Sequence, residues 1–205
     1  VLRRVVGEVN ELVKGHPEVH YLGGMAPTFS ELDVNVVKGQ FISLGLALLS
    51  VTVLMMIVFR SLLAGVISII PLILSIVILF GLMGHLSIEL NMATALLTSI
   101  MIGVGIDYTI HFFWRYKEER SQGLPPAQAV MKTLLTTGRG IVFNAFSVII
   151  GFSALLASSF VPVQFFGFLV VVSIFACLIG ALVIIPSLVL VFKPSFLEPK
   201  TLISG

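Results

Sequence analysis

The sequence predicts an all-α polytopic membrane protein, and three observations support that prediction. Hydrophobic residues make up 58% of the 205 residues and charged residues only 11%, whereas soluble domains carry about 25% charged residues. The mean hydropathy is +1.13. Stretches without formal charge recur along the chain, and each offers the ~20 residues that a helix needs to cross ~30 Å of hydrocarbon. They are sufficient for five membrane spans.

The first 38 residues are mixed and polar, and we interpret them as the end of an extracytoplasmic domain with a linker helix. The segment EVHYLGG (18–24) is typical of a short strand that ends in a turn. The segment TFSE has capping-box spacing, with Thr28 as the cap and Glu31 reaching back to it. A helix is therefore expected to begin near Phe29 and to continue into the first span.

The membrane domain is predicted over residues 39–193, and a short cytoplasmic tail over 194–205. Pro71 interrupts the second span and is expected to kink it, while Asn91 is positioned to cap the third. The five spans are expected at about 39–59, 62–85, 92–113, 141–160 and 165–192.

A polar connection, residues 115–139, separates the third and fourth spans. Its segment PPAQAVMKTLLTTG begins with prolines and ends at Gly138, which are start and stop signals of a helix. Apolar residues recur within it at helical spacing. We therefore expect an amphipathic helix at about 125–137 that lies on the cytoplasmic surface of the membrane.

The placement of Lys and Arg predicts the orientation. The cytoplasmic side of a membrane protein carries an excess of these residues, so we expect a cytoplasmic C-terminus and an outward N-terminal segment. An outward N-terminal segment with no visible signal peptide leads us to expect a fragment of a longer protein. The residues that fall on the cytoplasmic side are Arg60, Arg115, Lys117, Arg120, Lys132, Arg139, Lys193 and Lys200.

Asp107 is the one formal charge inside the five predicted spans. A charge at mid-membrane costs at least ~2.5–3.5 kcal/mol on insertion scales, so its side chain is expected to face other helices or water. Because a low dielectric disfavours the charged form of a carboxyl, Asp107 can take up and release a proton. A proton-coupled pump requires such a group.

Nearby residues suit a proton relay. His111 follows one helical turn later and can titrate in the useful range. Tyr108 supplies a hydroxyl that can donate a hydrogen bond to a carboxylate on a partner helix. Asn144 and Ser147 are the most polar positions of the fourth span, and we expect them to hydrogen-bond Asp107 or a water beside it.

Simpler interpretations of the same residues stay open. Asp107 could be a purely structural group that Asn144 satisfies, and His111 could be an ordinary interfacial histidine. The other polar side chains could serve only helix packing. Gly103 and Gly105 remove bulk just before the aspartate, which would let another helix pack closely.

Other chemistries have no recognisable motif. Cys177 lies in an apolar run and is expected to be buried and inert. The sequence contains no Cys/His set with zinc spacing, no nucleotide-binding loop and no Ser/His/Asp arrangement, and no basic tract indicates nucleic-acid binding. We therefore expect no enzymatic activity and no cofactor. An ion gradient would supply the energy, with H⁺ as the coupling ion and Na⁺ as the alternative.

The chain resembles the membrane portion of resistance-nodulation-division (RND) exporters, specifically the MMPL branch related to sterol-sensing domains. The resemblance covers about residues 39–198 and centres on the G-x-G-x-D-Y-x-x-H pattern of the third span. The matching segments are VFRSLLAGVISIIPLILSIVILFGLMG, ELNMATALLTSIMIGVGIDYTIHFFWRYKEER, TTGRGIVFNAFSVIIGFSALLASSF and FFGFLVVVSIFACLIGALVIIPSLVLVFKP.

The resemblance implies a half-transporter, of which this chain would supply the last five spans of the C-terminal half. It maps the family's proton-coupling Asp–Tyr pair onto Asp107 and Tyr108. It implies an exporter of lipid-like or hydrophobic substrates that lies in the bacterial inner membrane and is driven by the proton-motive force. The partners implied are the lipid bilayer, the other half of the transporter, periplasmic or envelope proteins and the substrate.

Two other functions stay open. The accessory subunit of Sec protein export shares the six-span architecture, but its family places Asp-Ala-Asn where this chain has Asp-Tyr-Thr at residues 107–109. A sterol-sensing-like domain that binds lipid and regulates a partner would not transport. A titrating carboxyl at Asp107 would distinguish an exporter from such a sensor.

Overall fold

The chain forms a bundle of long helices. The structure is a computed structural model and describes residues 2–13, 25–88, 90 and 92–198, in which every regular element is helical. The elements are α1 (Leu2–Val13), α2 (Met25–Phe59), α3 (Leu62–His85), α4 (Met92–Ser121), α5 (Pro126–Thr133), η1 (Leu134–Gly138), α6 (Arg139–Ser153), η2 (Ala154–Ala157), α7 (Val161–Ile179), η3 (Gly180–Ile184), α8 (Ile185–Phe192) and η4 (Ser195–Leu197).

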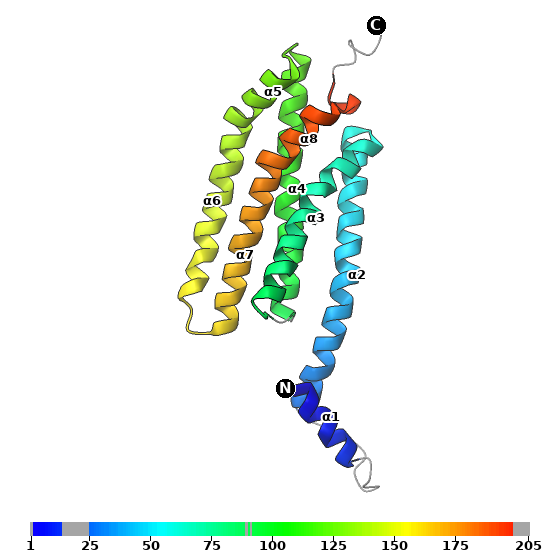
Figure 1. Ribbon diagram of the computed structural model, residues 1–205, viewed down its shortest axis with the longest axis vertical. Helices are drawn as coiled ribbons and strands as arrows, with labels where there is room; N and C mark the ends of the chain where they lie inside the picture. The colour runs from blue at the N-terminus through cyan, green and yellow to red at the C-terminus, as the bar shows by residue number, and fades with distance from the viewer. Residues whose placement is uncertain (1, 14–24, 89, 91, 199–205) are drawn as a thin grey trace.

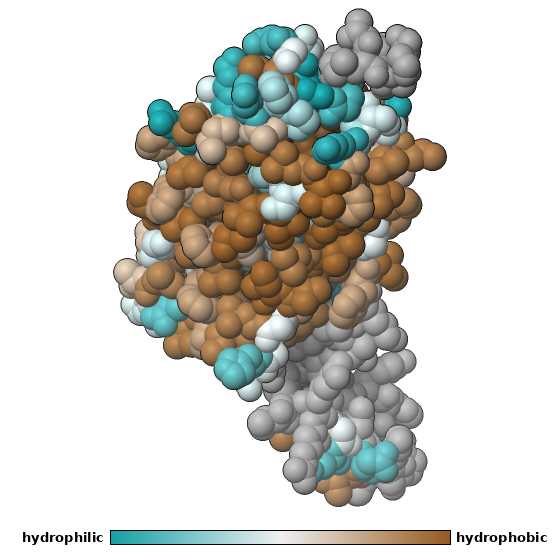
Figure 2. Space-filling view, turned by 45° about the horizontal axis from the view of Figure 1, so that its top comes forward, coloured by the Kyte–Doolittle hydropathy of each residue, from teal (hydrophilic) through white to brown (hydrophobic). Residues whose placement is uncertain are grey.

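Five segments of the described chain are long and apolar enough to cross a membrane, which confirms the predicted all-α class. Two of them join several elements: α5, η1, α6 and η2 continue one another, as do α7, η3 and α8. Figure 2 shows a broad hydrophobic belt, with hydrophilic residues at the end where α4 gives way to α5. The segments are Gly39–Phe59, Leu62–His85, Leu96–Ser121, Pro126–Ala157 and Val161–Phe192.

Three helices form the centre of the bundle. Side chains of α3, α4 and α7 interlock there, and Leu72, Met101 and Ile174 are almost completely buried. The outer helices are α2, on one side of the bundle, and α6, on the other (Figure 1). Few of their residues are buried within this chain. Most of the surface of α2 and α6 is therefore left for lipid or for another chain.

Glycine and proline shape the contacts between helices. A Cβ added at Gly65 would lie 2.7 Å from Met56 and 2.8 Å from the carbonyl oxygen of Thr52, so α3 can cross α2 closely only without a side chain there. Pro71 lies inside α3 without ending it, and a Cβ at Gly180 would approach the Pro71 ring to 2.9 Å. Small residues thus let these apolar helices approach one another.

Several predicted boundaries differ from the observed ones. The helix leading into the first span begins at Met25, so Thr28 lies inside the helix and is not its N-cap. The third long helix continues to Ser121, which makes the charged segment after residue 113 helical. The strand predicted at 18–24 and the cap predicted at Asn91 lie outside the described residues.

A helix covers the segment predicted at about 125–137, but it does not stop at Gly138. The helix that starts at Pro126 continues through Gly138 into α6, because Gly138 has helical backbone angles (φ −56°, ψ −39°). A wider, π-helical turn at Leu134–Gly138 keeps the backbone hydrogen bonding unbroken. A Cβ at Gly138 would lie 3.5 Å from Leu182. That distance is an ordinary van der Waals contact, so an alanine would fit here, and Gly138 does not stop the helix.

Candidate functional site

Asp107 lies on the face of α4 that points away from the bundle core. The opposite face of α4 carries Met101, Tyr108 and Phe112, which are buried among the central helices. The Asp107 side chain is 51% exposed. Its face consists of exposed residues spaced three or four apart, namely Ser99, Gly103, Asp107, His111 and Trp114. Helical periodicity therefore places the acid on a stripe that the described helices leave largely uncovered.

His111 lies directly beside the acid. Its Nε2 is 3.4 Å from Oδ1 of Asp107, the separation of an ion pair when the imidazole is protonated. The two residues are four apart in one helix, so the helix backbone itself fixes their proximity. An acid and an imidazole at this distance can share or exchange a proton, directly or through one water.

A pocket opens between this face and the fourth membrane-spanning helix. It has a volume of about 250 Å³. Asp107, Tyr108 and His111 line it from α4. Across from them, Thr137 of η1 and Gly140, Ile141 and Asn144 of α6 complete the lining. The sequence-predicted acid, tyrosine, histidine and asparagine therefore surround one cavity that is large enough for several waters.

Tyr108 and Asp107 leave α4 in different directions. The tyrosine is 1% exposed and belongs to the packed core, although it also contributes to the pocket wall. Its hydroxyl has no hydrogen-bond partner among the described residues. A buried, unsatisfied hydroxyl costs about 1–3 kcal/mol. Tyr108 thus contributes to the pocket wall, while its hydroxyl is shielded from solvent and keeps unused hydrogen-bonding capacity.

The two polar residues of the fourth span have different surroundings. Asn144 lines the pocket on the side opposite Asp107. Ser147 donates its hydroxyl hydrogen to the backbone carbonyl of Phe143 at 2.8 Å and is not among the residues that line the pocket. Thr137 was not singled out from the sequence. Its spacing of seven residues from Asn144 could have indicated that both lie on one helix face.

The two glycines before the acid also differ. A Cβ at Gly105 would lie 2.5 Å from Cδ2 of Leu72 and 3.1 Å from Sγ of Cys177, so this glycine is where α4 approaches α3 and α7. A Cβ at Gly103 would meet nothing within 4 Å. The described helices do not pack against Gly103, so its predicted packing role stays a prediction. Cys177 is buried, as expected.

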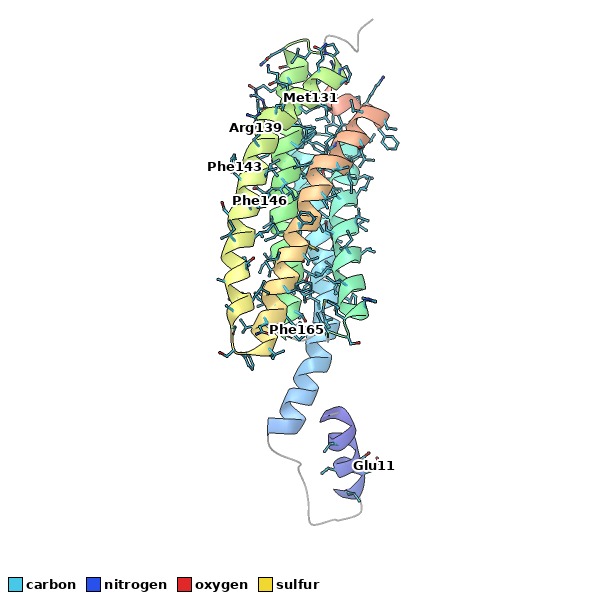
Figure 3. The ribbon with its side chains drawn as sticks, turned by 60° about the vertical axis from the view of Figure 1, so that its left-hand side comes forward. Glu11, Met131, Arg139, Phe143, Phe146 and Phe165 are labelled. Carbon is cyan, nitrogen blue, oxygen red and sulfur yellow. The ribbon has the colours of Figure 1, made fainter. Side chains whose placement is uncertain are left out.

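Exposed side chains, most of them apolar, lie along α5 and α6. Figure 3 labels Met131, Arg139, Phe143 and Phe146 on the continuous segment that α5, η1 and α6 form. Phe143 is 74% exposed. Exposed aromatic and aliphatic side chains on a long apolar helix are typical of contact with lipid.

Five membrane-spanning helices, with an acid–histidine pair on the third that borders a pocket, define a multi-pass membrane protein with an ionisable intramembrane site. The sequence matches the MMPL family over residues 2–203. The chain belongs to that family, as the resemblance predicted.

Individual relatives agree with this assignment. A membrane protein of Methanocaldococcus jannaschii is 29% identical over 194 residues, which are 93% of this chain and 50% of the relative. MmpL12 of Mycobacterium tuberculosis, described as a transport protein, is 26% identical over 97% of this chain and 18% of its own length. The trehalose monomycolate exporter MmpL3 of Mycolicibacterium smegmatis is 28% identical over 62% of this chain and 13% of its own. The chain thus spans half or less of the length of these relatives.

Proposed function

We propose that this chain is part of the membrane domain of an RND-type exporter in which Asp107 carries the coupling proton. The observation that carries the proposal is the position of Asp107. Its carboxylate borders a pocket, has an imidazole 3.4 Å away and lies on a helix face that this chain leaves uncovered. A structural carboxyl would be satisfied within its own bundle, whereas a proton carrier needs access to water and a neighbouring acceptor.

The uncovered face of α4 supports a second membrane half as partner. A charged group on a lipid-facing helix costs at least ~2.5–3.5 kcal/mol, so a helix face that carries both Asp107 and His111 is unsuited to lipid. Helices from the other half of the transporter would cover it. Their polar groups would then meet the acid, the histidine and Asn144 at the pocket.

The relatives' names favour export over the two alternatives. MmpL3 of Mycolicibacterium smegmatis is named for trehalose monomycolate export, and a relative in Bacillus anthracis, 27% identical over 49% of this chain and 14% of its own length, is an apo-petrobactin exporter. A lipid sensor or a Sec accessory subunit has no counterpart in these names. We propose a lipid-like or hydrophobic substrate for this protein, with H⁺ as the coupling ion, Na⁺ as the alternative and no enzymatic step.

The proposed cycle uses the described geometry. The N-terminal segment faces outward and the C-terminus is cytoplasmic. Asp107, protonated from the outside, becomes neutral and lets α4 pack more closely against its partner helices. The proton then leaves through water near His111 toward the cytoplasm. Because α2 continues beyond the bundle as a single helix (Figure 1), movement of the bundle can reach an extracytoplasmic domain.

Asp107→Asn in the complete transporter tests the proposal. The amide keeps the shape of the side chain but cannot carry a proton, so export driven by a pH gradient should stop while the protein still inserts and folds. Ser99→Ala, on the same exposed face, serves as the matched control and should leave export unchanged. Intact export by Asp107→Asn would refute the proposed role.

A further inference from the structure

Glu119, near the cytoplasmic end of α4, is a buried carboxylate outside the site described above. Its side chain is 0% exposed, and both carboxylate oxygens are shielded from solvent. Acidic residues are almost never fully buried unless they are paired with a cation. Its neighbour Glu118 shows the ordinary behaviour, since its side chain is 48% exposed.

Two cations from different segments reach the buried carboxylate. Nη2 of Arg115 lies 2.6 Å from Oε1 and comes from the preceding turn of α4. Nζ of Lys132 lies 2.7 Å from Oε2 and comes from α5. Neither oxygen receives a well-aligned hydrogen bond among the described residues. The three groups are therefore held together mainly by charge attraction, which is strong where water is excluded.

This contact lies where α4 and the following helix converge. The side chain of Lys132 belongs to the segment that continues through η1 into α6 without a break. Near its start this segment packs on α4 through α5 and η1, whereas α6 packs against α7 (Figure 1). The two helices separate beyond η1, and the pocket at Asp107 opens in that space.

We propose that Glu119 is a positioning residue whose ion pairs with Arg115 and Lys132 hold α5 against α4 and so set the width of the pocket at Asp107. Thr137, Gly140 and Asn144 belong to the same continuous helix as Lys132, so a shift of α5 moves the pocket wall. Loss of the carboxylate removes the anion that joins Lys132 of α5 to α4, while Arg115 keeps only Glu118 of its own helix, so the charge attraction between the two helices is lost.

Only the expected effect of Glu119 on export rests on the proposed function. The spacing of α4 and α5 can be measured without any transport assay. Gly140 offers a reporter position, because it lines the pocket and a Cβ added there meets nothing within 4 Å. Gly140→Cys in the complete protein, reconstituted in lipid nanodiscs, can therefore be labelled with a charged maleimide. Native Cys177 is buried and is retained.

The expected result is a several-fold faster labelling of the reporter when Glu119→Gln is added. Lys132→Met, which removes the bridging cation from a side chain that is 46% exposed, should have an effect in the same direction. Glu118→Gln is the matched control, because Glu118 contacts Arg115 only within α4 at 2.9 Å. It should leave the labelling rate unchanged.

If Gly140→Cys is labelled at the same rate with and without Lys132→Met, the proposal is overturned. The Lys132→Met variant provides this test even if Glu119→Gln does not fold. An equal increase with Glu118→Gln would also overturn the proposal, because any loss of charge at this end of α4 would then suffice. Failure of the proton-carrier function would instead appear as intact export by Asp107→Asn and would leave the labelling rates as expected here.

Discussion

Replacing each of two glycines on α4 with alanine tests the close approach of the central helices. Alanine at Gly105 would place a Cβ 2.5 Å from Cδ2 of Leu72 and 3.1 Å from Sγ of Cys177. Leu72 is 1% exposed and Cys177 is 3% exposed, so Leu72 would have to turn within a closely packed core to admit the Cβ. Gly103 lies half a turn away and has open space at the same position.

The pair separates packing from helix propensity. Alanine in a helix interior is favoured over glycine by about 0.5–1 kcal/mol, and this gain applies equally at both positions. Overpacking a filled core costs about 1–3 kcal/mol, and this cost applies only at Gly105. We therefore expect Gly103→Ala to be neutral or stabilising, and Gly105→Ala to be less stable than Gly103→Ala by about 1–3 kcal/mol.

The assay is reversible unfolding of the purified protein in mixed micelles with increasing denaturing detergent, followed by circular dichroism. The free energies of unfolding of both variants are compared with that of the unmodified chain. Equal stabilities for Gly103→Ala and Gly105→Ala would refute the close packing of α4 on α3 and α7. A destabilised Gly103→Ala alone would show that the outward face of α4 is the tightly packed one.

Two further predictions concern other parts of the bundle. Arg120→Met should release the C-terminal segment, because the guanidinium pairs with the Glu198 carboxylate at 8% and 16% side-chain exposure. The stabilisation of this segment that is lost should lie between the ~1 kcal/mol of an exposed ion pair and the ~3–5 kcal/mol of a buried one. It is measured as faster amide hydrogen exchange over residues 195–198, and the exposed Lys117→Met serves as the control. Unchanged exchange in Arg120→Met would contradict the pairing. Ser147→Ala should leave export intact, since its hydroxyl bonds its own helix, whereas Asn144→Ala should reduce export. Equal losses of export in Ser147→Ala and Asn144→Ala would show that Asn144 has no special role through the pocket.

Local sequence was a good guide wherever a single helix decides the outcome. The apolar stretches predicted five spans because a long run of hydrophobic residues has few other solutions in a membrane. The proximity of Asp107 and His111 also followed from spacing alone, since residues four apart on a helix are neighbours. Boundaries were less accurate. Gly138 resembled a stop signal, but its backbone keeps helical angles and the helix continues through it into α6.

The sequence by itself determined the helical class, the number of spans and the single acid placed within them. Only the tertiary structure decided which side of each helix is covered. Gly105 lies at a close helix contact, whereas Gly103 does not. Tyr108 points into the core and Asp107 away from it. Glu119 is buried, whereas its neighbour Glu118 is exposed. The physical reason is that lipid and protein interior are both apolar, so hydropathy does not distinguish a lipid-facing side from a core-facing one. That distinction depends on the shapes of the neighbouring helices.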